Sequence, residues 1–409
     1  MCIRDREFID NLDMLKSMSV EEQTLYKKWQ EFNKNPDFQK YAYKFDLFSH
    51  KIWKPTDINN LELTISEIEN LNPYVEIVDN KNQTSVENWT LLRRLIHSME
   101  YVANPGRNIK VIAKDRNTNK VLGMMSLGSD ITSLGVRDDW IGWTKDNKFK
   151  DGKLRCTSIG TSIVATQPFG FNFLGGKLVA MLLTDESLRQ HWKKTYGDEL
   201  VGLTTTALYG VHSMYNGIPL WKTLGESAGK IALKPDDSVY KPWLDWMKDE
   251  RADDYKRIMT PKEGVSGPPT GVKQTLISYM FKELGIVKSH YNHGFKRGVY
   301  FSSFYENGRD FLKNEINADE LVMRPKFAQG SEYINKWWKR QAIKRYTKLY
   351  DSNRLKPEHL YYIDAIGMDW DKMKNNYLNS KTFRETSKLE NIALKFQSSS
   401  EMISVATKD

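Results

Sequence analysis

The chain has 409 residues, of which 40% are hydrophobic and 28% are charged. This balance is typical of folded globular proteins and excludes a disordered or fibrous chain, and the length predicts two or three structural units. Lys and Arg outnumber Asp and Glu by 61 to 52, a net charge of +9, which suits a polyanionic partner. No apolar run reaches the roughly 18–20 residues of a membrane helix, so we expect no membrane-spanning segment.

The start of the chain and its cysteines bear on where the protein works. No charged and then apolar leader opens the sequence, so we expect a protein that is not secreted. Two cysteines, Cys2 and Cys156, exclude a disulfide framework and a four-cysteine zinc site, and a cytoplasmic location is expected. Residues 1–6 resemble a translated sequencing adapter, so we expect an altered natural N-terminus and assign Cys2 no role.

Residues 1–84 are expected to form a helical N-terminal arm. Apolar side chains at helical spacing predict a helix over 20–32, namely Leu25, Trp29 and Phe32. The looser alternation over 57–80 fits either a strand or a short helix.

A second helix is predicted to begin at a capping box formed by Thr84 and Glu87, because each side chain can satisfy a free amide of the first turn. The helix carries one apolar stripe, Leu91, Leu92, Leu95, Ile96 and Met99. We expect it to end at Asn104-Pro105-Gly106, since Pro and Gly interrupt helices.

The middle of the chain alternates strands and helices. Strands are predicted at 108–115, 120–127, 159–167 and 200–206, and the first two form a hairpin. Two helices between the last two strands carry the apolar residues Leu178, Met181, Leu182, Leu188 and Trp192. This order predicts an α+β fold, with a mixed sheet flanked by helices, at 85–235.

Pro and Gly residues concentrated at 260–271 predict a boundary inside a linker region, 236–272. A basic, mostly helical C-terminal domain is expected at 273–378 and a mobile polar tail at 379–409. One predicted helix of this domain carries six cations, Lys336, Lys339, Arg340, Lys344, Arg345 and Lys348. Its expected buried face comprises Ile334, Trp338 and Tyr346. The cations either stay solvated or bind the phosphates of nucleic acid and release its counterions.

The turn after the strand at 159–167 has residues suited to a phosphate group. Free amides at a helix N-terminus favour anions, and glycines let a ligand approach the backbone. The candidate residues are Gln167, Gly170, Asn172, Gly175 and Gly176. The alternative is a turn whose glycines only permit tight packing of the strand against the helix.

The sequence of hairpin, strand, glycine turn, helix, strand and tyrosine resembles the GNAT acyltransferase fold. The resemblance implies that acetyl-CoA or another acyl donor rests its pyrophosphate on the turn after the fourth strand, where the family has Gln/Arg-x-x-Gly-x-Gly/Ala. Gln167–Asn172 matches this pattern except at its last position, and Asn172–Gly176 keeps the glycines without the Gln or Arg. It also implies a tyrosine after the fifth strand as general acid. Tyr215 is the positional match, and a packed aromatic residue is the alternative.

Four blocks in this order resemble the DruA family of Druantia anti-phage systems. They are Pro105–Asn108, Arg137–Thr144, Tyr215–Trp221 and Leu224–Lys230. The resemblance covers about 85–235 and is strongest in Arg-Asp-x-Trp-Ile-Gly-Trp. Two departures suggest a diverged or phage-borne relative: Tyr215 and Trp221 are one residue further apart than in the family, and an acidic segment is replaced by Leu203–Thr206.

The same core is similar to Mom, the GNAT-like DNA-modification protein of phage Mu, which implies a nucleic-acid base as the acceptor. Independently, the run from Arg137 to Trp143 places a cation and two carboxylates between tryptophans. We expect Arg137 and Asp138 or Asp139 to contact the acceptor or act as base, and Trp140 and Trp143 to stack on a flipped base. The alternative is an Arg–Asp pair beside two core tryptophans.

Histidines offer two weaker candidates. His212 and Ser213 precede Tyr215, but the sequence lacks the Gly-x-Ser-x-Gly elbow of a serine hydrolase. His290 and His293 lack further evident ligands, so no metal site is predicted.

These observations predict a DruA-like protein that acts on DNA, with a GNAT-type core that transfers a group to a base. One alternative is a core without the donor site that serves as a non-catalytic nucleic-acid-binding module. Another is an acetyltransferase for a small molecule or a protein. The expected partners are DNA and other proteins of a defence or phage system, with no membrane.

Overall fold

The computed structural model describes residues 3–33, 44, 48–101, 106–208, 213–227, 233–260, 272–287, 296–356 and 368–376. Several predicted features therefore lie outside the described residues: the linker at 261–271, the tail from 379, the breaker residues 104 and 105, and His212, His290 and His293. Within the described ranges, no helix is both long and apolar enough to cross a membrane.

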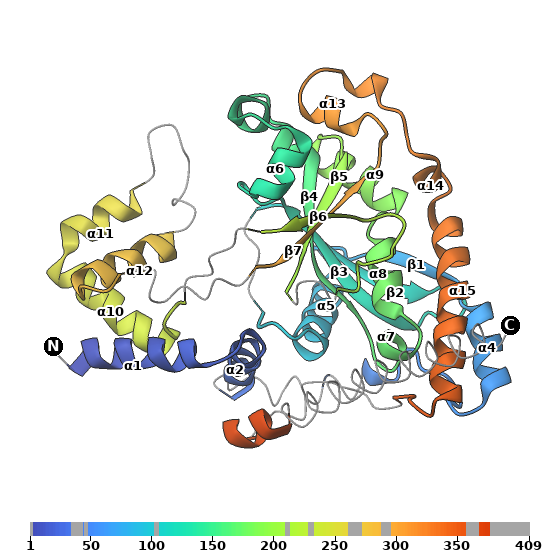
Figure 1. The fold of residues 1–409 in the computed structure, drawn as a ribbon, viewed down its shortest axis with the longest axis horizontal. Helices are drawn as coiled ribbons and strands as arrows, with labels where there is room; N and C mark the ends of the chain where they lie inside the picture. The colour runs from blue at the N-terminus through green and yellow to red at the C-terminus, as the bar shows by residue number, and fades with distance from the viewer. Residues whose placement is uncertain are drawn as a thin grey trace, which may run out of the picture.

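A seven-stranded mixed sheet forms the centre of the fold (Figure 1). Its strands are β1 Pro73–Ile77, β2 Asn108–Asp115, β3 Val121–Ser129, β4 Thr157–Ala165, β5 Gly202–Ala207, β6 Lys222–Glu226 and β7 Gly298–Ser303. They lie in the order β1-β2-β3-β4-β5-β7-β6. The pair β4 and β5 is parallel, and the other neighbouring pairs are antiparallel. The predicted α+β class and mixed sheet are confirmed.

The predicted hairpin is confirmed as β2 and β3. Its turn is fixed by Asp115, which is only 1% exposed. The Asp115 carboxylate accepts hydrogen bonds from the Thr118 amide at 2.9 Å and hydroxyl at 2.6 Å, and from the Asn72 amide at 2.7 Å. Short polar side chains that bond to nearby backbone favour such turns, which is the reason this segment reverses direction.

Helices cover both faces of the sheet (Figure 1). The larger core lies under α4 Leu61–Asn70, α7 Phe169–Asn172, α8 Gly175–Leu182, α9 Glu186–Tyr196 and α15 Gly330–Asp351. The second core lies under α2 Val20–Asn33 and α5 Gln83–Ile96. Successive side chains of β2 lie on opposite faces of the sheet and so contribute to both cores. Val111 belongs to the first core and Ile112 to the second.

The start of α5 differs from the prediction. The capping residue is Asn82, whose side chain accepts a hydrogen bond from the Ser85 amide at 3.1 Å, so the predicted capping box at Thr84 was wrong. Asparagine is among the strongest N-capping residues, and this one lies two positions earlier in extended conformation. The helix ends at Ile96, before the expected Met99.

The range 57–80, expected to form either a strand or a short helix, contains one of each: helix α4 and then strand β1.

The sheet extends beyond the expected core of 85–235 in both directions. Strand β1 precedes that range, and β7 follows the expected linker yet pairs with both β5 and β6. Helix α15 packs against α8, α4 and β1, and its Trp338 and Tyr346 belong to the same hydrophobic core as β2 and β3. The segment after the linker region thus completes the sheet, because β5 gains its second neighbour only from β7.

A helical lobe lies beside the sheet (Figure 1). It comprises α1 Ile3–Ser17, α10 Asp237–Glu250, α11 Ala252–Met259 and α12 Val272–Glu283. Phe8 packs against Trp243 and Phe281 in a separate hydrophobic core. Asn11 and Asp236 exchange two hydrogen bonds, so the beginning of the chain is fastened to residues more than 200 positions away.

The remaining short helices border the far end of the sheet. They are α6 Gly135–Ile141, α13 Gly308–Leu312 and α14 Pro325–Ala328, with the single turns Asp146–Lys150, Lys153–Cys156 and Ala318–Glu320. Helix α6 contacts β6 and β7, and α14 leads into α15.

Candidate nucleic-acid interface

The run Arg-Asp-Asp-Trp-Ile-Gly-Trp forms most of α6 and its C-terminal cap. Gly142 has a φ of 84°, a left-handed conformation that glycine adopts without strain, and its amide donates to the Asp138 carbonyl at 2.9 Å. Ile141 is fully buried in the core. The indole of Trp143 donates to the Leu312 carbonyl at 2.7 Å. The run therefore specifies a short helix that is fixed at its end and on its inner side.

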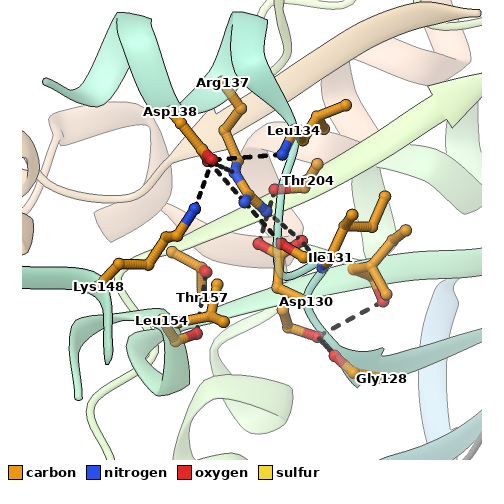
Figure 2. A network of polar contacts seen from close by, with 12 residues as sticks. Gly128, Asp130, Ile131, Leu134, Arg137, Asp138, Lys148, Leu154, Thr157 and Thr204 are labelled. Atoms are coloured by element: carbon orange, nitrogen blue, oxygen red, sulfur yellow. Dashed lines mark hydrogen bonds and ion pairs between the residues drawn. The ribbon is translucent and has the colours of Figure 1, made fainter. Parts of the chain in front are cut away.

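Arg137 forms a completely buried ion pair with Asp130, which follows β3 (Figure 2). Its Nη1 lies 2.6 Å from Asp130 Oδ1, and both side chains are 0% exposed. The Asp130 carboxylate also accepts hydrogen bonds from the Thr204 hydroxyl at 2.8 Å and from the Ile131 amide at 2.7 Å. These extra bonds offset the desolvation cost of burying two charges.

The other side of Arg137 contacts Asp138 (Figure 2). Asp138 Oδ1 accepts from Arg137 Nε at 3.0 Å and Nη2 at 2.7 Å. Asp138 Oδ2 accepts from Lys148 Nζ at 2.6 Å and from the Leu134 amide at 3.2 Å. Two cations and two carboxylates thus balance each other and join α6 to β5. The structure brings Arg137 and Asp138 together, with both Asp138 oxygens engaged by these donors.

The two tryptophans expected to stack on a base occupy different environments. Trp143 packs beneath the Arg137 guanidinium, which lies 5.1 Å from its ring centre. Trp140 is half-buried and packs on Phe301 of β7, with 5.3 Å between ring centres. Two cations lie over the Trp140 ring, Lys222 Nζ at 5.0 Å and the Arg309 guanidinium at 5.1 Å. Trp143 also has a second cation near its ring, Lys148 Nζ at 5.9 Å, but Arg137 and Lys148 are both paired with Asp138.

Trp140 lines a groove of about 580 Å³ between α6, the start of β6 and α14. Its apolar wall includes Pro219, Trp221, Phe301 and Phe327. Its charged lining comprises Lys222, Arg324 and Lys326 and one carboxylate, Glu306. The sequence does not predict this cluster of cations, because they come from two segments about a hundred residues apart and no local pattern connects them.

The turn between β4 and α8 holds the residues proposed to cradle a donor phosphate. A Cβ added to Gly175 would lie 2.4 Å from the ring of Phe169, so this glycine permits that ring to pack against the helix start. Gln167 Oε1 accepts from the Phe171 amide at 3.1 Å. A Cβ on Gly170 would lie 2.7 Å from the Gln167 amide nitrogen. These residues are in contact with one another and with the aromatic core.

Asn172 is fully buried and bonded on both ends of its amide. Its Nδ2 donates to the Pro168 carbonyl at 2.9 Å and to the Lys356 carbonyl at 2.7 Å, and its Oδ1 accepts from the Lys356 amide at 2.9 Å. The side chain therefore joins this turn to the segment that follows α15.

Tyr215 belongs to the segment that leads into β6, and its side chain is buried. It is 6% exposed and packs on Tyr300 and Trp221, with ring centres at 5.1 and 5.5 Å. Its phenol oxygen lies 3.4 Å from the hydroxyl of Thr205 on β5. Burial raises the pKa of Tyr215 well above its usual range, because the surrounding core disfavours the phenolate. Next to it, a Cβ on Gly176 would lie 3.0 Å from the Met214 sulfur.

Helix α15 carries the basic residues in two different settings. Its predicted buried face is confirmed, since Ile334, Trp338 and Tyr346 are at most 2% exposed. Lys339 donates to the Glu69 carbonyl in the last turn of α4 at 2.6 Å, and Arg345 lies over the Phe171 ring at 5.0 Å.

The remaining four cations of α15 are exposed and occur every fourth residue: Lys336, Arg340, Lys344 and Lys348. We refer to these four residues as the α15 stripe. All four are among the six cations of this helix that the sequence offered as phosphate contacts.

Comparison with known proteins identifies the same family that the run of residues in α6 resembles. A family model described as "Druantia protein DruA" matches residues 26–314. A curated relative, the Druantia protein DruA of Escherichia coli (strain UMEA 4076-1), is 27% identical over 251 residues, which cover 56% of this chain and 59% of the relative. The chain therefore spans less than two thirds of that protein. No solved structure matches the chain significantly. Because the family match covers more than half of its length, this chain belongs to the DruA family.

Proposed function

We propose that this chain binds DNA as a component of a Druantia anti-phage defence system and that it contacts the phosphate backbone through the α15 stripe. The observation that carries the proposal is the regular exposure of Lys336, Arg340, Lys344 and Lys348 on one helix. Family membership supplies the defence setting.

The geometry of α15 suits a repeating array of negative charges. Residues four positions apart are separated by about 6 Å along a helix, so the stripe runs for about 18 Å. The helix is held by bonds from its buried face, because Trp338 Nε1 donates to the Phe173 carbonyl at 2.9 Å and the Tyr346 hydroxyl to the Ile58 carbonyl at 2.7 Å. The cations are therefore arranged on a rigid support before any ligand arrives.

The charges of the stripe are also available for a partner. Among the residues with described positions, no carboxylate forms an ion pair with any of the four cations. Each cation that meets a phosphate would release a condensed counterion, so affinity depends steeply on salt.

Salt-dependent binding of a labelled 30-base-pair duplex tests this proposal. The triple variant Lys336→Gln, Arg340→Gln and Lys344→Gln should lower the slope of log affinity against log salt by about 2.7, since each phosphate contact contributes about 0.9. The control neutralises three exposed lysines of the helical lobe, Lys241, Lys256 and Lys282. It removes the same net charge and should change the slope little. Equal slopes for the two triple variants would contradict a role for α15.

A second candidate function is group transfer to DNA by a GNAT-type core. The arrangement that supports it is the parallel pair β4 and β5, which is bonded only over Thr157–Ile159 and Gly202–Thr204. The glycine turn follows the fourth strand and Tyr215 follows the fifth, in the order that the GNAT resemblance implies. The packing of Phe169, Asn172 and Met214 against the same turn supports the binding function instead.

Nucleoside mass spectrometry separates the two functions. DNA would be taken from cells that express the chain and from cells that express Tyr215→Phe, which keeps the ring but lacks the hydroxyl. A transferase would produce a new nucleoside mass that disappears in the variant. A DNA-binding protein without transfer activity would leave both profiles unchanged while retaining duplex affinity.

A further inference from the structure

We propose that the groove beside Trp140 binds an unpaired nucleotide of a DNA strand, with the base stacked on the indole and the phosphates held by the surrounding cations. This inference rests on the proposed DNA-binding function and specifies the form of DNA that the groove accepts.

The lining of the groove combines the two features that a nucleotide requires. The half-buried indole of Trp140 offers an aromatic surface, and Lys222 and Arg309 lie at 5.0 and 5.1 Å from its ring centre. Arg324 and Lys326 line the groove further along. Aromatic surfaces bind bases with little sequence preference, because every base has a flat π-face, and nearby cations bind the backbone. An acidic peptide would use the cations but would leave the indole without a stacking partner.

The position of Trp140 favours unpaired over paired DNA. One side of its ring packs against Phe301 at 5.3 Å, so the indole forms part of a wall and does not project outwards. A base inside a duplex is stacked on both faces by its neighbours, and it must leave the helix before a side chain can stack on it. The volume of about 580 Å³ lies within the range of about 300–1,000 Å³ that is usual for small-molecule pockets.

The groove is continuous with the α15 stripe along the chain. Arg324 and Lys326 belong to α14 and its N-terminal cap, and α15 begins at Gly330, directly after α14 (Figure 1). A strand bound along the stripe would therefore be led towards the groove. Lys222 belongs to β6, so cations from two segments far apart in the sequence line the same groove.

The buried ion pairs of α6 hold Trp140 in place. Arg137 lies one helical turn before Trp140 and is fixed by Asp130 and Asp138. The stacking surface is thus preorganised, and little conformational freedom is lost when a base binds.

Binding of a 20-nucleotide oligothymidine and of a 20-base-pair duplex to the full chain tests the inference. Trp140→Ala should weaken single-strand binding by about 5- to 150-fold, the range expected for the loss of one stacked base. Its duplex affinity should stay within about twofold of that of the unmodified chain. The matched control is Trp246→Ala in the helical lobe, because Trp246 is also half-buried beside a cation, with Arg251 at 5.2 Å, but lies outside the groove.

Two further variants test the groove with changes that should preserve the fold, so that weaker binding cannot be ascribed to unfolding. Trp140→Phe keeps an aromatic ring against Phe301 and should retain part of the single-strand affinity. Lys222→Gln with Lys326→Gln leaves the core intact and should lower the salt slope for the single strand. An oligonucleotide with one 2-aminopurine should change fluorescence on binding to the unmodified chain and not on binding to Trp140→Ala.

The outcomes distinguish the two proposals. Equal losses in Trp140→Ala and Trp246→Ala, or equal losses of single-strand and duplex binding in Trp140→Ala, would overturn the groove inference while leaving the α15 stripe in place. If the unmodified chain binds neither form of DNA, both proposals are overturned.

Discussion

The side chain of Asn172 is bonded to both backbone groups of Lys356, a residue 184 positions later in the chain. Its Nδ2 donates to the Lys356 carbonyl at 2.7 Å, and its Oδ1 accepts from the Lys356 amide at 2.9 Å. The Asn172 side-chain amide thus bonds both backbone groups of Lys356, as a neighbouring β-strand would. The turn after β4 and the segment after α15 are thereby held together at the edge of the main core.

This contact predicts a structural role for Asn172 that differs from that of a cofactor ligand. Replacing Asn172 with alanine removes the three hydrogen bonds of this buried side chain, and each unsatisfied buried group costs about 1–3 kcal/mol. We expect the free energy of unfolding in urea to fall by at least about 2 kcal/mol. The exposed Asn59 provides the control, where alanine should change the stability by less than about 0.5 kcal/mol. Unchanged stability of Asn172→Ala would show that these bonds contribute little.

The ion pair between Arg137 and Asp130 predicts that removing one partner lowers the free energy of unfolding more than removing both. Arg137→Met leaves the Asp130 charge buried without its cation. It should lower the free energy of unfolding by about 3–5 kcal/mol. The double variant with Asp130→Leu removes both charges and should recover part of that loss. Arg155→Met is the exposed control, with its Nε 3.8 Å from Asp198 and a side chain 65% exposed, and should cost less than about 1 kcal/mol. Urea unfolding measures all three variants, and a double variant no more stable than the single one would contradict this account.

The lowered pKa of His97 predicts that the protein loses stability on mild acidification. Burial, followed by the nearby positive charges of Arg93 and Lys28, lowers the pKa of His97 well below 6.5. The unfolded chain takes up a proton near pH 6.5 and the folded chain does not, so this contribution is complete above pH 6.5 and falls as the pH decreases below it. The slope approaches about 1.4 kcal/mol per pH unit for one proton.

The variant His97→Asn tests this slope. Its amide oxygen can replace Nδ1 as acceptor for the Met99 amide, which lies at 3.0 Å, but the side chain does not titrate. Urea unfolding between pH 5 and pH 7.5 should therefore show a shallower pH dependence in the variant than in the unmodified chain. Identical slopes would mean that other groups cause the acid sensitivity.

Local patterns predicted the secondary structure where one face of an element is apolar. The hairpin at β2 and β3, the helices α8 and α9 and the buried face of α15 follow directly from the spacing of their apolar residues. The N-cap of α5 was placed two residues late, because Thr84 and Asn82 both satisfy the local rule and only the backbone conformation selects between them. The DruA family was also correctly identified from four short blocks of sequence. The strongest of them, around Arg137, forms one continuous helix and its cap.

The candidate site could be predicted only in part. Trp140 and the six cations of α15 were predicted as nucleic-acid contacts. Trp140 is half-buried, and the four cations of the α15 stripe are exposed. Lys339 and Arg345 have the same side-chain chemistry as their neighbours, yet they turn towards α4 and Phe171. Their roles depend on which element lies beside the helix, and helical spacing alone does not contain that information.

The sequence by itself determined the elements, the family and the amphipathic character of α15, because these depend on residues within a few turns of one another. Tertiary structure decided that β7 joins the sheet across the linker region. It also decided that Arg137 is buried against Asp130, whose carboxylate accepts a hydrogen bond from Thr204. It also decided that Lys222 and Lys326 meet at Trp140. The physical reason is that burial and charge pairing are set by contacts between distant segments, and such contacts form only when the chain packs as a whole.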